Sequence, residues 1–328
     1  GRINDIKAEP GQTVTSPFLN GIPATNSSTG DVRIEFYAAI RTPEPFLPAG
    51  TVIAREQTYV HTFHKEDAPK QAFAGSEEDD RQVVFSGPHF KATFDKQSGL
   101  LVSYRYKKQE YIHNGQGPRP FFWRAPTDND YGAKLPVRLK AWKEASYQEP
   151  KAESFNVVRD KDTTAVKVTY RFPQTDARWD ITYKVYGNGV IKVDNHFVAE
   201  NAQTPMIPRV GLRMRLPARI TSLTYYGRGP EENYRDRRTS QFIGEYTSGI
   251  QDMYEPYVRP QENNHRTDIY WCTLTSKAKE GLLFVADRTF EMNVSNYPLE
   301  SLDSGESIEN GSPRTEKTNH RHLTDPQP

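Results

Sequence analysis

The sequence predicts an all-β protein built from antiparallel sheets and divided into two domains. At 328 residues the chain is longer than most single domains. Aromatic residues make up 12% of it, including 18 Tyr and 16 Phe, which suits sheets that bury one face and wet the other. Short segments of alternating apolar and polar residues recur along the chain, whereas helical patterns are scarce. Together these observations favour antiparallel β structure over a doubly wound sheet or a (β/α)₈ barrel.

A small N-terminal domain is predicted first. Residues 31–37 (DVRIEFY) alternate in polarity, and residues 51–59 form a second extended segment after a proline-rich connection. We therefore expect residues 1–65 to belong to a small β-sandwich that is incomplete. Residues 66–80 contain Pro69, Gly75 and an acidic run with little to bury, which is typical of a linker.

The larger domain is predicted to span residues 81–328 and to consist of many short strands. The clearest hairpin joins residues 179–186 to 190–198 across Gly187-Asn188-Gly189, because Asn-Gly tolerates the positive φ of a tight turn. One helix is expected at residues 135–147, where Leu135, Leu139 and Trp142 share a face. The other strands are predicted at residues 82–86, 90–95, 101–106, 155–159, 165–172, 210–216, 222–226, 269–274 and 281–286.

Charge and composition exclude several classes of partner. Forty-three Lys and Arg residues against 42 Asp and Glu give a net charge of +1, which predicts neither a nucleic-acid partner nor an anionic membrane surface. No apolar run approaches the roughly 18 residues of a membrane span, so we expect a soluble protein. Cys272 is the single cysteine, which excludes an internal disulfide but does not separate cytoplasm from periplasm. The chain begins without Met and ends on a turn-like DPQP, so a fragment of a longer protein is expected.

Three motifs carry a family resemblance. They are FWRAPTDNDYG at residues 122–132, YGRGPEENYRD at 226–236 and DMYEPYVRPQEN at 252–263, with a weaker fourth, NHRHL, at 319–323. In composition, order and spacing they resemble the C-terminal region of the large β-galactosidases of glycoside hydrolase family 2. The resemblance covers about residues 80 to 323.

The resemblance implies a fold and an origin. It implies a galactose-mutarotase-like β-supersandwich from about residue 81 onward, preceded by the tail of an immunoglobulin-like linking domain. In that family an upstream barrel holds both catalytic carboxylates and the magnesium and sodium ligands. No Gly-Asn-Glu acid motif occurs in this chain, so we expect no catalytic residue, cofactor or metal here. The family's active-site tryptophan follows the His-Arg-His stretch, and this sequence ends before it, so the sandwich is expected to be truncated.

The resemblance also implies a function for the parent protein. The whole enzyme would hydrolyse terminal non-reducing β-D-galactose residues by double displacement, while this part buttresses the barrel and shapes one wall of the site. Its expected partners are the β-galactoside, the barrel of the same enzyme and, in an oligomer, further copies. Its expected location is the cytoplasm or periplasm of a bacterium.

One set of residues is the candidate surface for a carbohydrate or for the barrel. Flat rings stack on the apolar faces of sugars, and neighbouring acids and arginines bind the hydroxyl groups. The competing interpretation, which we favour, is that the acids cap turns and pair with arginines while the rings fill the core. The candidates are Trp123, Arg124, Asp128, Asp130, Tyr131, Glu232, Tyr254, Tyr257 and Glu262.

Two segments contain residues typical of metal sites, but we favour an interpretation without a metal for both. The run that begins at Asp128 resembles a calcium loop, but Gly132 comes one position too early and Leu139 stands where a bidentate Glu is required. We expect a loop whose Asp and Asn side chains bond their own backbone. His320 and His322 share one face of a strand, and a surface pair is favoured over a metal site.

Two other functional classes remain open at the level of sequence. The first is a free-standing carbohydrate-binding module, which the aromatic and Asp/Asn-rich loops favour. The second is an aldose mutarotase or epimerase, because the implied fold is shared. That alternative requires His265 as general base to converge with Glu262 or Glu291 in one concave pocket.

Overall fold

The computed structural model describes residues 7–15, 30–61, 74–160, 163–201 and 206–303. Its chain divides into two units, Gly1–Ala68 and Pro69–Pro328. In the first unit, β1 (Val32–Ala39) and β2 (Val52–His61) form an antiparallel pair. β1 was predicted from the alternation of residues 31–37, and β2 from the extended segment at residues 51–59. The immunoglobulin-like assignment of residues 1–65 stays a prediction.

The second unit begins with a five-stranded antiparallel sheet. Its order is β3 (Gly75–Glu78), β4 (Gln82–Ser86), β5 (Phe90–Asp95), β6 (Leu101–Tyr106) and β7 (Gln109–Glu110). The predicted strands 82–86, 90–95 and 101–106 are confirmed. Residues 75–78 were assigned to the linker of residues 66–80, and here the prediction was wrong. As an edge strand, β3 buries no side chain and so lacks the alternation that reveals a strand.

A four-stranded antiparallel sheet follows, in the order β12, β11, β10, β9. Its strands are β9 (Ser154–Asp160), β10 (Thr163–Phe172), β11 (Ala177–Val185) and β12 (Ile191–Ala199). Every second residue of β11 is buried, as alternation requires of a strand with one face in the core. The predicted hairpin of β11 and β12 is confirmed, and Gly189 takes the positive φ of 93° in its turn.

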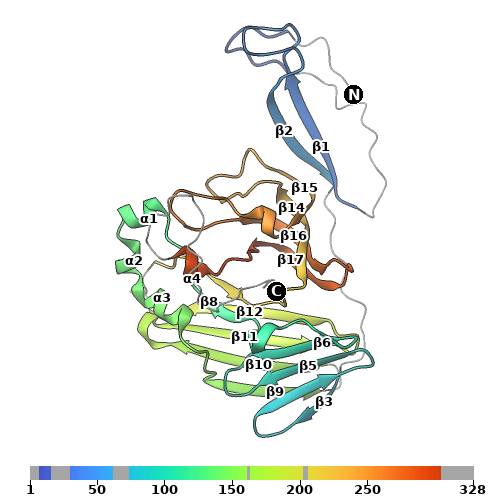
Figure 1. Ribbon diagram of the computed structural model, residues 1–328, viewed down its shortest axis with the longest axis vertical. Helices are drawn as coiled ribbons and strands as arrows, with labels where there is room; N and C mark the ends of the chain where they lie inside the picture. Colours follow the sequence, from blue (N-terminus) through green and yellow to red (C-terminus); the bar gives the residue numbers. More distant parts are fainter. Residues whose placement is uncertain (1–6, 16–29, 62–73, 161–162, 202–205, 304–328) are drawn as a thin grey trace. The chain divides into compact units, whose positions relative to one another are not determined.

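These two sheets pack against one another around the first hydrophobic core (Figure 1). Phe94 of β5 and Tyr183 of β11 meet with ring centroids 5.1 Å apart. Tyr104 of β6 donates a hydrogen bond of 2.7 Å to the carbonyl oxygen of Gly189. Each fully buried Phe-sized side chain contributes about 1.5 to 3 kcal/mol of hydrophobic stabilisation, so this core holds the two sheets as one layered body.

A third sheet contributes side chains to a second hydrophobic core. Its order is β15 (Phe242–Gly249), β14 (Ile220–Gly229), β16 (His265–Ser276) and β17 (Gly281–Asn293). The strands predicted at 222–226, 269–274 and 281–286 lie inside longer observed ones. β15 was missed, because only Phe242 and Ile243 of it are buried. The strand predicted at 210–216 is reduced to β13 (Gly211–Arg213), which pairs with β8 (Arg119–Phe121).

Helices are short, and they refine two predictions. The helix predicted at 135–147 is split into α2 (Leu135–Arg138) and α3 (Lys140–Tyr147), because Leu139 has a non-helical φ of −112° and ψ of 20°. Its buried face is confirmed, since Leu139 and Trp142 lie in the core. No helix in the described ranges is long and apolar enough to cross a membrane.

Residues 128–132 form a helical turn, α1 (Asp128–Gly132), where a loop was expected. Thr127 and Asp130 bond each other's backbone amides, which makes a capping box. The expectation that acids here bond the local backbone therefore holds, but the bonds start a helix. The remaining short elements are η2 (His113–Gly115), η3 (Pro173–Thr175), η4 (Gln251–Met253) and α4 (Leu299–Leu302).

Candidate functional site

The three sequence motifs meet in space. The amide of Glu262 donates to the carbonyl oxygen of Ala125 at 3.0 Å, which joins the third motif to the first. Glu232 of the second motif accepts hydrogen bonds from the Tyr257 hydroxyl and from the Asn264 amide, the latter at 2.9 Å. We call this region the motif junction: residues 122–132, 226–236 and 252–263 together with the polar residues that contact them. Its parts are positioned by the end of β8, the end of β14 and the start of β16.

Glu262 is the most deeply buried acid of the motif junction. Its side chain is 1% exposed and forms an ion pair with Arg209. Asn293 donates to the same carboxylate oxygen at 3.0 Å, while the other oxygen, Oε2, is buried without a hydrogen-bond partner among the described residues. A buried carboxylate is tolerated only with a countercharge, so Arg209 is structurally required. Sequence reasoning missed Arg209, because it lies outside all three motifs.

His265 contacts one amide and one acid of the motif junction. Its Nδ1 lies 2.8 Å from Asn293 Oδ1, and its Nε2 lies 2.9 Å from Glu291 Oε2. The amide group of Asn293 donates to Glu262 and to the carbonyl of Asn263, so its oxygen faces the imidazole as an acceptor. Both ring nitrogens are therefore engaged.

Glu291 is held by an arginine and a histidine. Arg235 donates to its Oε1 at 2.6 Å, and His265 contacts its Oε2. Partial burial alone would raise the pKa of the Glu291 carboxyl, but the hydrogen bonds from Arg235 and His265 outweigh it and hold the pKa below its usual range. Glu291 is thus set up to accept hydrogen bonds rather than to give a proton.

Trp123 serves the core. Its ring is 2% exposed, and its Nε1 donates to Asp303 at 2.9 Å. Lys143 pairs with the same carboxylate at 2.6 Å and lies 5.7 Å from the centre of the indole. A ring enclosed in this way offers no open face for a sugar.

The acids around α1 have arginine partners. Arg124 binds the Asp130 carboxylate with two hydrogen bonds of 3.1 and 2.7 Å. Asp128 has a side chain 76% exposed, with Arg259 at 3.4 Å. The same guanidinium lies 5.0 Å from the ring centre of Tyr131, a cation–π contact.

The remaining candidates are Glu232, Tyr254 and Tyr257. Glu232 pairs with Arg237 and accepts from Tyr257. Tyr254 packs on Tyr297 with centroids 4.6 Å apart. The pairing of acids with arginines, which we favoured from sequence, is confirmed for Asp130 and Glu232. Among the candidates, the structure joins Arg124 directly to Asp130 and Tyr257 directly to Glu232. The partners of Trp123, Tyr254 and Glu262 are other residues.

This arrangement is suited to holding segments together. A general acid needs a proton to give, and a general base needs a free lone pair. The carboxylates of Asp130, Glu232 and Glu262 instead accept hydrogen bonds from guanidinium groups. His265 does approach Glu291, and Asn293 links it to Glu262, and both of its ring nitrogens are engaged within this hydrogen-bond network.

No group of three or more potential metal ligands occurs among the His, Cys, Asp and Glu residues that the structure describes. The calcium-like segment at Asp128 is accounted for by helix capping. His320 and His322 lie outside the described residues, so the surface-pair interpretation stays a prediction.

The fold and the site define the class as an antiparallel all-β domain whose three motifs are joined by the hydrogen bonds of Glu262 with Ala125 and of Tyr257 with Glu232. Residues 86–322 match the family described as the beta galactosidase small chain, and the chain belongs to that family. The family match confirms the resemblance that the three motifs carried, and the all-β fold is confirmed with it.

Individual relatives agree with this assignment. A β-galactosidase of Priestia megaterium is 32% identical over 250 residues, which are 75% of this chain and 24% of the relative. A β-galactosidase of Streptococcus thermophilus is 30% identical over 92% of this chain and 28% of its own length. One from Lactobacillus delbrueckii subsp. bulgaricus is 30% identical over 88% of this chain and 28% of its own length. The chain thus spans only about a quarter of the length of these relatives.

Proposed function

We propose that this chain is the C-terminal part of a glycoside hydrolase family 2 β-galactosidase, an enzyme that removes terminal non-reducing β-D-galactose. In this proposal the chain is not catalytic. It buttresses an upstream barrel domain and shapes one wall of the galactoside site. The observation that carries the proposal is the motif junction, where the acids Asp130, Glu232 and Glu262 are each paired with an arginine.

The comparisons support the parent activity at a coarser level. The relatives are named β-galactosidases, and about three quarters of each lies outside the match, which leaves room for a separate catalytic domain. The magnesium and sodium that the family resemblance implies are assigned to that domain, and no step here depends on them. The isolated chain should therefore show no hydrolysis.

The first test is turnover. Purified chain is assayed with nitrophenyl β-D-galactoside, and no release of nitrophenol above the buffer rate is expected. Turnover that copurifies with the chain and survives rechromatography would contradict the non-catalytic role.

The second test addresses the buttressing role. A parent enzyme truncated at the start of this region should lose most of its activity, and adding the separate chain should restore part of it. A matched chain that carries Glu262→Gln should restore less, because the motif junction is weakened. The exposed Glu144→Gln, outside the motif junction, should restore as much as the unchanged chain. Full activity of the truncated parent alone would refute the buttress.

A further inference from the structure

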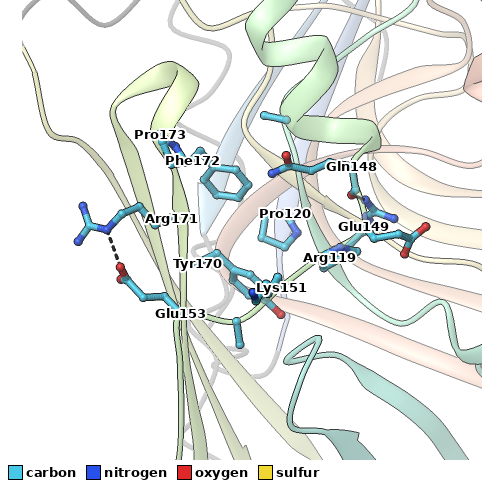
Figure 2. Close-up of a pocket in the computed structure, with 13 residues that line it drawn as sticks. Arg119, Pro120, Gln148, Glu149, Lys151, Glu153, Tyr170, Arg171, Phe172 and Pro173 are labelled. Atoms are coloured by element: carbon cyan, nitrogen blue, oxygen red, sulfur yellow. Dashed lines mark hydrogen bonds and ion pairs between the residues drawn. The ribbon is translucent and has the colours of Figure 1, made fainter.

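The connection between β1 and β2 (Figure 1) contains a fully exposed phenylalanine, Phe46, with a relative exposure of 101%. By contrast, the rings of Phe172 and Tyr170 beside the cavity in Figure 2 are almost completely enclosed. A single exposed apolar residue is ordinary on a protein surface. Phe46 is not single, because Val52 and Ile53 at the start of β2 are 50% and 60% exposed.

Backbone hydrogen bonds hold this connection in one conformation. The amides of Glu44 and Leu47 each donate to the carbonyl oxygen of the other at 3.0 Å, which closes a tight turn that contains Phe46. At the base of the connection, the Gly50 amide donates to the carbonyl oxygen of Ile40 at 2.7 Å. The phenylalanine is therefore carried by a defined turn.

Phe46 has a backbone conformation that bulky residues rarely adopt. Its φ is 68°, in the left-handed region. Because Pro45 precedes it, this is the pattern of a type II turn, whose third position usually holds Gly or Asn. Strained positions of this kind cluster at functional sites. Packing of the exposed Phe46 ring within the described chain does not offset the strain, so we looked for its role in a contact with another part of a larger protein.

The chemistry of the turn indicates an apolar partner. Residues 45–50 read Pro-Phe-Leu-Pro-Ala-Gly and carry no charge. A charged ligand would find no countercharge on these residues. Aromatic side chains are enriched at protein interfaces, and a turn that is already ordered loses little conformational freedom on docking. An apolar pocket on a protein surface therefore fits this turn best.

The relatives indicate where that pocket lies. The β-galactosidase of Streptococcus thermophilus matches 92% of this chain, a match long enough to include the turn, and nearly three quarters of that relative lies outside the match. Strands that completed the predicted sandwich of residues 1–65 would pack on the face of β1 and β2. The connection lies beyond the ends of both strands, so it is available to another domain of the parent enzyme.

We propose that Phe46 is an anchor that docks this chain on the part of the parent β-galactosidase outside it, with the ring in an apolar pocket of that part. The inference rests on the proposed function, since it names a contact through which the chain buttresses the rest of the enzyme. Residues 40–51 are then protected from solvent in the parent and exposed in the chain alone.

The first test is photocrosslinking in the parent enzyme. p-Benzoylphenylalanine replaces Phe46, and mass spectrometry after irradiation should identify a bond to a residue of the same subunit outside the 328 residues of this chain. Crosslinks confined to this chain would overturn the proposal. A product of twice the subunit mass would also overturn it, because the partner would then be a second copy. Failure of the unmodified parent to hydrolyse nitrophenyl β-D-galactoside would refute the proposed function, whereas the crosslinks report on docking alone.

The second test is Phe46→Asn, because Asn tolerates a positive φ but is poorly suited to an apolar pocket. In the chain alone this variant should leave the Tm unchanged or raise it. In the parent enzyme it should speed amide hydrogen exchange at residues 40–51 by at least about tenfold, as expected when one aromatic anchor is lost.

Val137→Asn is the matched control, because Val137 of α2 is 78% exposed and lies in the second unit. It should leave exchange at residues 40–51 of the parent unchanged. Equal exchange in the Phe46→Asn and unchanged parents would contradict the anchor. Strong protection of residues 40–51 in the chain alone would contradict it as well, since the turn would then be covered without the rest of the enzyme.

Discussion

At the scale of single residues, the motif junction contains ion pairs in very different surroundings. Glu262 is fully enclosed beside Arg209, whereas Asp128 meets Arg259 at the surface. An enclosed carboxylate has lost its water and depends on its partner, whereas an exposed one is solvated with or without it. The two pairs therefore provide a matched comparison.

Glu262→Gln should lower the free energy of unfolding by about 2 to 3 kcal/mol, because it leaves Arg209 without a countercharge. This loss of unfolding free energy is smaller than that expected for a fully buried ion pair, because the side chain of Arg209 is 24% exposed and regains some water. Asp128→Asn should change stability by less than about 0.5 kcal/mol. Urea unfolding followed by tryptophan fluorescence measures both, and equal effects would refute the assigned difference.

Sequence identified Glu262 but not the residue it pairs with. The motif that contains Glu262 is local, whereas its partner Arg209 is brought near only when β16 and the segment before β13 fold together. The same limit applies to Trp123, which was a candidate for the carbohydrate- or barrel-facing surface although we favoured a core position for such rings. Its indole is enclosed because Asp303, 180 residues further on, accepts its N–H. Neither long-range contact leaves a local pattern.

At the scale of elements, local chemistry was enough wherever one face of a strand is buried. The hairpin of β11 and β12 follows from alternation and an Asn-Gly turn. Prediction failed where burial does not alternate, as in β3 and β15, and where a capping residue starts a helix, as Thr127 does for α1. The break between α2 and α3 at Leu139 was not predicted either, because the helical spacing of apolar residues continues across it.

The turn between β5 and β6 depends on Gly99. Its φ is 74°, and a Cβ there would lie 2.5 Å from Val168 Cγ1. Gly99→Ala should therefore cost about 1 to 3 kcal/mol in unfolding free energy. Gly132→Ala is the control, because no atom lies within 4 Å of its added methyl, and it should be neutral or slightly stabilising. Thermal unfolding of both variants measures this difference in stability. A Gly99→Ala variant as stable as the unchanged chain would contradict the prediction.

The β6–β7 hairpin gives the protein a predictable response to acid. Burial alone would raise the pKa of Glu110, but hydrogen bonds from Ser103 and from the amides of Ile112 and Tyr104 outweigh it and lower the pKa. The stability that Glu110 contributes is therefore complete above its ordinary pKa of 4.5 and is lost as pH falls through the lower value in the folded protein.

Glu110→Gln should cost about 1 to 2 kcal/mol at pH 7, where the carboxylate accepts these bonds. The difference from the unchanged chain should shrink below pH 4.5, since the wild-type carboxyl is then protonated in the unfolded state. Urea unfolding at a series of pH values measures it, with the exposed Glu144→Gln as control. A difference that stays constant down to pH 3 would contradict this assignment.

At the scale of the whole molecule, the second unit has two hydrophobic cores that Tyr104 and Tyr106 both adjoin. Shared side chains couple the cores, so we expect the sheets to unfold together. The family and the all-β class were predictable, because ordered motifs and alternation persist along the chain. The contacts between the motifs were not, because they join residues as far apart in sequence as Ala125 and Glu262.

Cys272 reports on that cooperativity. It is buried in β16 within the second core, and burial raises the pKa of its thiol to about 12. Its reaction with a disulfide reagent at pH 8 should be at least about 1,000-fold slower than in denaturant, since the thiolate forms only after opening. The rate should increase in parallel with loss of β-sheet circular dichroism. Rapid labelling of the native chain would show that β16 opens independently.

The acidic edge strand β3 has a consequence for how copies of this protein behave when crowded. Glu77 is exposed, and Glu78 is bound by Lys96 and Arg159, so the outer margin of the five-stranded sheet carries ionic side chains along its free backbone. A second molecule that docked its own strand there would have to strip water from those charges. The charged residues that remove the apolar–polar alternation from β3 therefore also disfavour strand pairing between molecules.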